Sequence, residues 1–330
     1  MIQPFTSTIA ATPVNEAAVA EVERARQQRR HKNVTVLMGG FSAEREVSLS
    51  SGASAVRALE SAGYRVQAVD VSRDMGSLLH HLERTKPDVV FNALHGRYGE
   101  DGCVQGMLNV LDLPYTHSGL LASALAMDKP TAKRVYDAAG LSVARHMLVT
   151  REDLLAGDPL SLPYVIKPYN EGSSVGVMII EEERADRPFK HSWPYGPSVM
   201  AEDFIPGREL TVAVMGSHAL GVTEIMTDRT FYDYDAKYAE GGSSHTLPAC
   251  LPEDVYAEVQ SLAVRAHRAL GCRGVSRADF RYDGHRLVIL EVNTQPGMTQ
   301  TSLAPEQALL SGIDFASLCT WLVETASCDP

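Results

Sequence analysis

Cysteine is scarce in this chain of 330 residues, and its five cysteines lie far apart with no Cys-x-x-Cys pair. An odd, scattered set disfavours a disulfide framework and is typical of a reducing compartment, so we expect a cytoplasmic protein. No apolar run reaches the ~18 residues that a membrane span needs. The sequence therefore predicts no membrane partner.

Positive charge is also in short supply, since 30 basic residues face 41 acidic ones and the formal net charge is −11. This balance disfavours a general nucleic-acid binder, although it is compatible with a local basic pocket for phosphate. Two nucleotide-binding signatures are missing as well. The chain lacks Gly-x-Gly-x-x-Gly, which argues against a dehydrogenase, and it lacks the P-loop pattern Gly-x-x-x-x-Gly-Lys-[Ser/Thr].

What the sequence does contain is a regular alternation of strand and helix patterns. An apolar run at 33–38 ends in two glycines, a helical pattern follows over 46–62, and strand patterns occupy 66–71 and 88–94. Strand and helix alternation with short links predicts an α/β fold with a doubly wound parallel sheet. Ligands of such sheets bind at the C-terminal ends of the strands.

The order of patterns along the chain predicts four segments. Residues 1–31 are Ala-, Glu- and Arg-rich, and we expect a flexible, dispensable extension, although a frayed helix is compatible with this composition. Residues 32–118 should form an N-terminal substrate-binding domain, and residues 119–201 a central domain. Residues 202–330 should form a C-terminal domain with a long helix, a metal site and a lid loop.

Two strand-like runs near the C-terminal end carry three oxygen-bearing side chains. The run 277–282 contains Asp279, and the run 287–294 contains Glu291 and Asn293. Alternate side chains of a strand share a face, so Glu291 and Asn293 point the same way, and Asp279 joins them if the two runs pair. Oxygen ligands without Cys or His favour Mg²⁺, which completes its shell with water and phosphate. A nucleoside triphosphate is thus expected, with an acidic surface hairpin as the alternative.

Glycines follow two strand patterns of the first domain. Gly39-Gly40 leads to Glu44 at the start of a helical pattern, and His95 opens a glycine-rich loop that runs to Gly102. Glycine lets a backbone turn tightly and approach a ligand. Two simpler interpretations stay open: Glu44 as an acid that stabilises the helix dipole, and a purely structural His95.

Two further segments suggest a covered phosphate site. Lys167 ends a strand pattern and precedes the small-residue loop 171–176, whose backbone N–H groups suit a phosphate, although a flexible surface loop is an equally good interpretation. The polar loop 227–246 contains three tyrosines and Lys237. Loops of such length are usually functional lids or disordered, and the aromatic residues favour a lid.

Taken together, these segments resemble the D-alanine–D-alanine ligases of the ATP-grasp superfamily over residues 33–325. Five motifs in the family's order carry the resemblance: Gly-Gly-x-Ser-x-Glu-Arg-Glu-Val-Ser, His-Gly-x-x-Gly-Glu-Asp-Gly, Glu-Gly-Ser-Ser-Val-Gly, Phe-Tyr-Asp-Tyr-x-Ala-Lys-Tyr and Glu-x-Asn-Thr-x-Pro-Gly-Met-Thr. The resemblance implies an ATP-grasp fold, in which two α+β domains clasp ATP. It also implies that ATP converts the carboxylate of one D-alanine into an acylphosphate, which the amine of a second D-alanine attacks. The product, D-alanyl-D-alanine, would supply peptidoglycan synthesis.

The same resemblance implies a role for each matching residue. Glu44 would hold the first substrate's ammonium, Ser173 and Tyr238 would link to Glu44, and Arg277 with the N–H of Gly297 would stabilise the oxyanion. The remaining expected amino-acid ligands are His95, Ser302 and Leu303. The expected ATP-binding residues are Lys129, Lys167, Glu202, Ile205, Glu209 and Lys237. The expected ligands of two Mg²⁺ ions, with Mn²⁺ as a substitute, are Asp279, Glu291 and Asn293.

Several alternatives and departures accompany this interpretation. A D-alanine–D-lactate ligase or another ATP-grasp dipeptide ligase would share these motifs. A degenerate ligase that only binds nucleotide is disfavoured by the intact metal, lysine and lid residues. Asp203 stands where many relatives carry Lys, Asn170 where Arg is common, and Asp235 in place of Glu. A homodimer formed through the first domain is expected from the family alone.

Overall fold

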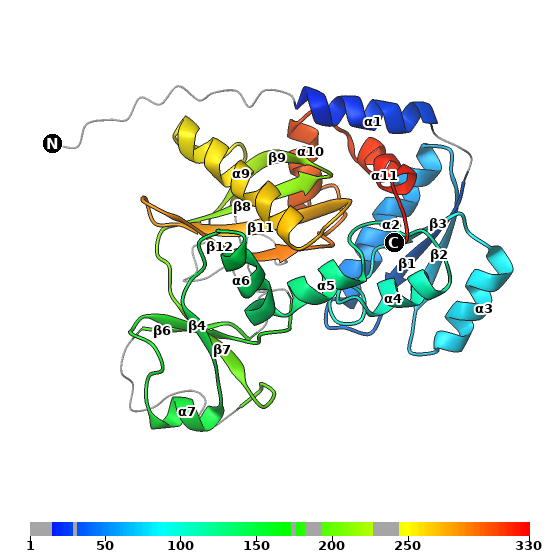
Figure 1. Cartoon of the computed structure of the whole chain (residues 1–330). Coiled ribbons are helices and arrows are strands. Elements are labelled where there is room, and N and C mark those ends of the chain that lie inside the picture. The colour runs from blue at the N-terminus through cyan, green and yellow to red at the C-terminus, as the bar shows by residue number, and fades with distance from the viewer. Residues whose placement is uncertain (1–14, 29–31, 173–175, 182–192, 227–243) are drawn as a thin grey trace.

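The computed structural model of the chain contains three β-sheets with helices packed around them (Figure 1). It describes residues 15–28, 32–172, 176–181, 193–226 and 244–330. The sheets follow one another along the chain, and the expected mixed α/β architecture is confirmed. No helix in these ranges is both long enough and apolar enough to cross a bilayer.

The N-terminal part is built around a parallel three-stranded sheet in the order β2-β1-β3. Val34 and Val36 of the central strand pack on one face, and Leu37 packs on the other. This burial on both faces explains why the strand is largely apolar. The elements of this part are β1 (Asn33–Gly39), α2 (Arg45–Ser61), β2 (Arg65–Val71), α3 (Met75–Thr85), β3 (Val89–Asn92) and α4 (Cys103–Val110).

The C-terminal part is an antiparallel five-stranded sheet in the order β10-β9-β8-β11-β12. Its long helix α9 packs on the sheet and buries Val259, Ala263 and Ala266, which recur at helical spacing. The elements of this part are β8 (Arg208–Met215), β9 (His218–Met226), β10 (Ser244–Thr246), α9 (Glu253–Ala269), β11 (Val275–Tyr282), β12 (Leu287–Asn293), α10 (Leu303–Leu310) and α11 (Phe315–Glu324).

The middle part contains an antiparallel four-stranded sheet in the order β4-β7-β5-β6. Two helices that precede this sheet in sequence, α5 and α6, pack on the C-terminal sheet, where Ala132 and Tyr136 join Leu210 and Phe280 in one core, and α6 also contacts β4 of the middle sheet. Helices α5 and α6, expected in the central domain, thus share a hydrophobic core with the C-terminal sheet. The elements are α5 (Leu120–Met127), α6 (Lys129–Ala138), β4 (His146–Val149), α7 (Arg151–Ala156), β5 (Tyr164–Lys167), β6 (Met178–Ile180) and β7 (Val199–Asp203).

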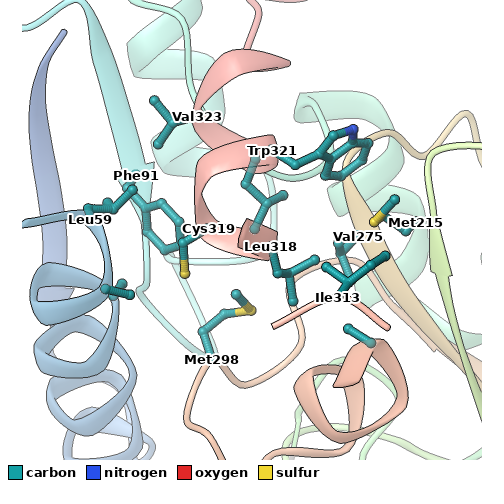
Figure 2. Close-up of a cluster of buried hydrophobic side chains, with 14 of the residues drawn as sticks. Leu59, Phe91, Met215, Val275, Met298, Ile313, Leu318, Cys319, Trp321 and Val323 are labelled. Carbon is teal, nitrogen blue, oxygen red and sulfur yellow. The ribbon is translucent and has the colours of Figure 1, made fainter. Parts of the chain in front are cut away.

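A hydrophobic core around α11 joins the first sheet to the third. Figure 2 shows Leu318 of α11 between Phe91 of β3 on one side and Met215 and Val275 of the C-terminal sheet on the other. Burial of this apolar surface stabilises the contact by about 25 cal/mol per Å² removed from water. The core therefore fixes the N-terminal sheet against the sheet that carries the acidic hairpin.

Residues 16–28 differ from the expected flexible tail. They form α1 (Glu16–Gln28), which lies along α11 in Figure 1 and buries Ala18, Val22 and Ala25 in the core around α11. These residues are spaced by four and three positions, so they share one helix face. Glu21 accepts a hydrogen bond from the indole N–H of Trp321 at 3.2 Å. The segment is a helical layer of the protein, and the expectation of a tail is wrong for these residues.

Candidate active site

A cleft of about 710 Å³, its solvent-open mouth included, lies where the three parts of the chain meet. It is lined by residues from the N-terminal glycine loops, α6, the loop after β5 and the acidic hairpin. The predicted site residues that line it are Glu44, His95, Lys129, Arg277, Glu291, Asn293 and Gly297. Glu44 and Gly297, which are 253 residues apart in sequence, thus open on one space.

The hairpin formed by β11 and β12 pairs as predicted. Asp279 lies opposite Glu291 in the register, and Arg277 lies opposite Asn293. The Arg277 guanidinium donates two hydrogen bonds to the Asp279 carboxylate, from Nε at 2.9 Å and from Nη2 at 2.7 Å. The Thr211 hydroxyl of the neighbouring strand β8 donates to the same Oδ1 at 2.6 Å. Three hydrogen bonds therefore hold the Asp279 side chain in one orientation.

The donor set of this hairpin fits Mg²⁺ or Mn²⁺. Asp279 and Glu291 supply carboxylate oxygens, and the Asn293 Oδ1, which accepts from the Gln295 N–H at 2.8 Å, keeps a second lone pair. The described residues contain no cluster of three or more His, Cys, Asp or Glu that suits a metal by itself. Two carboxylates and one amide match a hard ion that takes its other oxygens from phosphate and water.

Helix α6 directs two lysines toward the site. Asp128 caps the helix by accepting from the Thr131 N–H, and a proline follows in the first turn, so the helix begins at Lys129. The Lys129 Nζ donates to the Glu171 carbonyl at 2.7 Å and lies 3.3 Å from the Glu291 carboxylate. Lys129 therefore joins the loop after β5 to the acidic hairpin.

One turn further along α6, Lys133 enters a buried cluster of charges. Its Nζ contacts one oxygen of Glu202, and the Nζ of Lys167 lies 2.6 Å from the other oxygen. Burial alone would raise the pKa of Glu202, but the two lysines outweigh burial and lower this pKa to about 2. The pKa of Lys167 is raised because Glu202 and Glu291 outweigh the effect of its burial. Both groups are therefore ionised at neutral pH.

Arg281 organises the segment that follows β7. Its Nε donates to the carbonyl of Ile205 at 3.0 Å, and its Nη1 lies 3.2 Å from Glu209. Arg277, Asp279 and Arg281 alternate along β11 and so share one face of the strand. The predicted adenine and ribose residues, Ile205 and Glu209, are thus attached to the strand that carries the metal ligand, although they do not line the cleft itself.

Three loops approach the Glu44 side chain closely. At Gly96, whose φ is +68°, an added Cβ would lie 2.5 Å from Glu44 Oε2, and at Gly172 it would lie 3.0 Å from the same atom. Only glycine permits both the left-handed backbone and this approach at position 96. The Ser42 hydroxyl also donates to the His95 carbonyl at 2.7 Å. The glycines flagged by the sequence therefore pack the loops against the Glu44 carboxylate.

The His95 ring lies between a serine hydroxyl and a glutamate carboxylate. Its Nε2 is 3.1 Å from the Ser51 hydroxyl, which also accepts from the backbone N–H of Met298 at 3.2 Å. Its Nδ1 is 3.8 Å from Glu100 Oε2, a buried oxygen with no hydrogen-bond donor among the described residues. Ser51 thus connects the predicted substrate histidine to the loop that carries Gly297.

The turn before α10 places the last predicted residues. The Ser302 hydroxyl accepts from the Thr299 N–H at 3.1 Å, and an added Cβ at Gly297 would lie 3.0 Å from it. Leu303 follows as the first residue of α10 and is buried. Three other predicted residues, Ser173, Lys237 and Tyr238, lie outside the described residues.

Sequence reasoning missed four residues that hold the site together: Ser51, Glu100, Lys133 and Arg281. Two of them had a usable signal. Lys133 lies four positions after Lys129 on a helix, and Arg281 lies two positions after Asp279 on a strand, so each shares a face with a predicted residue. Ser51 gave no such signal, because its partners His95 and Met298 are distant in sequence. Glu100 lies five residues after His95 in the same glycine-rich motif, but the motif alone did not show that the two side chains face each other.

Comparison with known proteins identifies the family. The chain matches the families described as D-ala D-ala ligase N-terminus over residues 77–118 and D-ala D-ala ligase C-terminus over residues 135–324. A D-alanine–D-alanine ligase of Rhodospirillum rubrum is 62% identical over 299 residues, which cover 90% of this chain and 99% of the relative. The chain belongs to the D-alanine–D-alanine ligase family.

Solved structures of D-alanine–D-alanine ligases support the fold. The ligase of Bacillus anthracis complexed with ATP matches with a TM-score of 0.76 at 30% identity, covering 90% of this chain and 97% of that chain. The VanG D-Ala:D-Ser ligase of Enterococcus faecalis matches with a TM-score of 0.73 at 28% identity, covering 89% of this chain and 99% of that chain.

The family membership confirms both the resemblance and the activity expected from it. The protein is an ATP-dependent ligase that joins two D-alanines, a step of peptidoglycan synthesis. A different dipeptide or depsipeptide product is not favoured, because the relatives with 53–62% identity are D-alanine–D-alanine ligases.

Proposed function

We propose that ATP binds between the middle and C-terminal sheets, and that both D-alanines bind between the N-terminal glycine loops and the segment before α10. The observation that carries this proposal is that Glu44, Lys129, Glu291 and Gly297 line one cleft. A carboxylate becomes a good electrophile only after phosphorylation, so the phosphate and the amino-acid regions must open on the same space.

The residues around α6 suit a nucleotide. Lys129 and Lys167 would lie against the phosphates, and Lys237 would add positive charge there. Glu202 and Ile205 would read the adenine, largely through backbone groups, at the C-terminal end of β7 and just after it. Glu209, placed by Arg281, would accept from the ribose hydroxyls. Positioning and charge neutralisation of this kind are the main requirements of phosphoryl transfer.

Asp279, Glu291 and Asn293 would hold two Mg²⁺ ions, or Mn²⁺ in their place. Bound ions at this position would neutralise charge on the phosphates. The hydrogen bonds from Thr211 and Arg277 fix the position of the Asp279 carboxylate, and neither side chain is itself a carboxylate that would bind the ion. This arrangement supports a divalent ion that a nucleotide brings with it.

The amino-acid end of the cleft suits two D-alanines. Glu44 would bind the ammonium of the first D-alanine, and Ser173 and Tyr238 would connect to Glu44. His95 would lie beside the carboxyl group of the first D-alanine. The Arg277 guanidinium and the Gly297 N–H would stabilise the oxyanion when the second amine attacks. Ser302 and Leu303 would hold the second carboxylate.

We also propose a cytoplasmic homodimer without nucleic-acid or membrane partners. The dimer follows from the family expectation. The absence of a nucleic-acid partner is supported by the formal net charge of −11.

The test is product analysis of the purified protein with ATP, Mg²⁺ and D-alanine. Phosphate release that depends on D-alanine, together with D-alanyl-D-alanine identified by mass, is the expected result. The same assay with D-lactate, D-serine or L-alanine as the second substrate should give far less product. ATP hydrolysis without any dipeptide would refute the proposal for the amino-acid end.

A further inference from the structure

We propose that Lys133 is a positioning residue for ATP. Lys133 neutralises Glu202, so the positive charge of Lys167 remains available to the phosphates of ATP. The inference deepens the ATP site proposed above and rests on it. It assigns a function to a buried lysine that does not itself line the cleft.

Lys133 is a second lysine beside Glu202, and its complete burial calls for an explanation. The Lys133 side chain has no exposed surface, and Glu202 is almost as deeply buried. Moving an ammonium out of water is costly unless a carboxylate or other acceptors compensate for the lost hydration. Burial lowers the pKa of Lys133, and the Glu202 carboxylate opposes that effect. A lysine placed only to stabilise the fold would be a poor choice, because an apolar side chain avoids this cost.

The charges of the cluster explain what Lys133 adds. One carboxylate lies between two ammonium groups, with one lysine on each oxygen. When Lys133 is protonated, the three groups carry one net positive charge. Without Lys133, Glu202 and Lys167 would form a neutral pair, and the attraction of Lys167 for an anion would be largely cancelled. At a buried site this difference is poorly screened by solvent.

The elements that carry the cluster place this charge between the two sheets that clasp ATP. Lys133 belongs to α6, which packs on β12 of the C-terminal sheet. Glu202 and Lys167 belong to β7 and β5, which pair in the middle sheet. Lys129, four residues earlier on the same face of α6, contacts the Glu291 carboxylate. One helix face therefore supplies a lysine to the metal hairpin and a second lysine to the adenine side.

A simple tie between the two sheets is the competing explanation, and the choice of ligand separates the two. ADP carries phosphates that would meet Lys167, whereas adenosine carries none. If Lys133 acts through charge, its loss weakens ADP binding and leaves adenosine binding unchanged. If Lys133 only holds the sheets in place, its loss distorts the whole site and weakens both ligands alike.

The experiment compares Lys133→Met with Arg134→Met, an exposed neighbour on the same helix, by calorimetry with Mg²⁺-ADP and with adenosine. We expect Lys133→Met to raise the Kd of ADP about tenfold, equivalent to ~1.4 kcal/mol, and that of adenosine less than twofold. Arg134→Met should change neither. Equal weakening of both ligands, or no weakening of ADP, would overturn the proposal.

A double-mutant cycle gives a second, independent readout. In the Glu202→Gln background, Lys167 no longer faces a carboxylate, so Lys133→Met should weaken ADP binding less than about threefold. An undiminished tenfold loss in that background would mean that Lys133 does not act through Glu202, which would contradict the proposal. If Lys133→Met does not fold, Lys133→Gln removes the charge and keeps a hydrogen-bond donor, and the same two ligands decide. Wild-type protein that fails to bind ADP would instead refute the ATP site itself.

Discussion

The two ends of the cleft are built from different interactions. Around the hairpin and α6, ion pairs dominate: Lys129 with Glu291, Lys133 and Lys167 with Glu202, and Arg277 with Asp279. Around the N-terminal loops, the Glu44 and Glu100 carboxylates line the cleft, but the contacts that hold His95 and the Gly297 loop in place come from hydroxyl and amide groups. The main neutral contacts are Ser51 with His95 and with the Met298 N–H, Ser42 with the His95 carbonyl, and Asn92 with Gln295.

This difference matches the charge of what each end would bind. An ion pair can exchange a partner for a phosphate or a metal ion without leaving a buried charge alone. A hydrogen bond between neutral groups gives direction but little charge, and the loss of one partner leaves the other unsatisfied. The charged end is therefore suited to anion binding, and the neutral end to fixing the geometry of small zwitterions.

The largest effect is expected from Glu291→Gln at the charged end. The change removes a proposed metal ligand and the partner of Lys129, so turnover should fall on the order of 100-fold, with a higher KM for ATP. The KM for D-alanine should change little, because Glu291 belongs to the ATP end. Steady-state kinetics with each substrate varied in turn measure both effects. Glu258→Gln, an exposed change on α9, is the control, and near-normal turnover of Glu291→Gln would remove the metal assignment.

A smaller effect with the opposite substrate dependence is expected from Ser51→Ala at the neutral end. The change leaves the Met298 N–H and the His95 Nε2 without their common partner, a loss of about 1–3 kcal/mol in buried surroundings. The KM for D-alanine should therefore rise about tenfold, while the KM for ATP stays near its wild-type value. Ser54→Ala, one turn along α2, controls for helix effects. Equal changes in both KM values would mean that the two ends are not separable.

The parts of the site that depend on local sequence signals were predicted well. The expected hairpin runs, 277–282 and 287–294, match β11 and β12 to within two residues, because alternation and a tight turn are local signals. Glu44, His95 and the metal ligands were found in motifs and do line the cleft or pair across the hairpin. The partners of two supporting residues, Lys133 and Ser51, escaped prediction for a physical reason. Lys133 meets a residue 69 positions away, and Ser51 one 247 positions away, so only folding brings them together.

For the N-terminal segment, composition led to a wrong prediction, because it did not reveal that residues 16–28 pack as a helix. Alanine dominates the buried stripe of α1, and a small apolar side chain contributes little to a helical pattern. Charged residues on the other faces reinforced the impression of a solvated tail. The stripe nevertheless packs well, because α11 offers Trp321 and its neighbours as a large apolar surface.

The smallest effect is expected from a change in α1, which does not line the cleft. Val22→Ala removes two methyl groups from the core around α11 and should destabilise the protein by about 1–2 kcal/mol. Its KM values for ATP and D-alanine should stay at the wild-type level. Thermal unfolding measures the loss, and Arg24→Ala, an exposed change on the same helix, should leave the Tm unchanged. If Val22→Ala also leaves the Tm unchanged, the segment is a dispensable tail after all. If either KM rises instead, packing around α11 controls the spacing of the two ends, and the contrast between them depends on a helix outside the cleft.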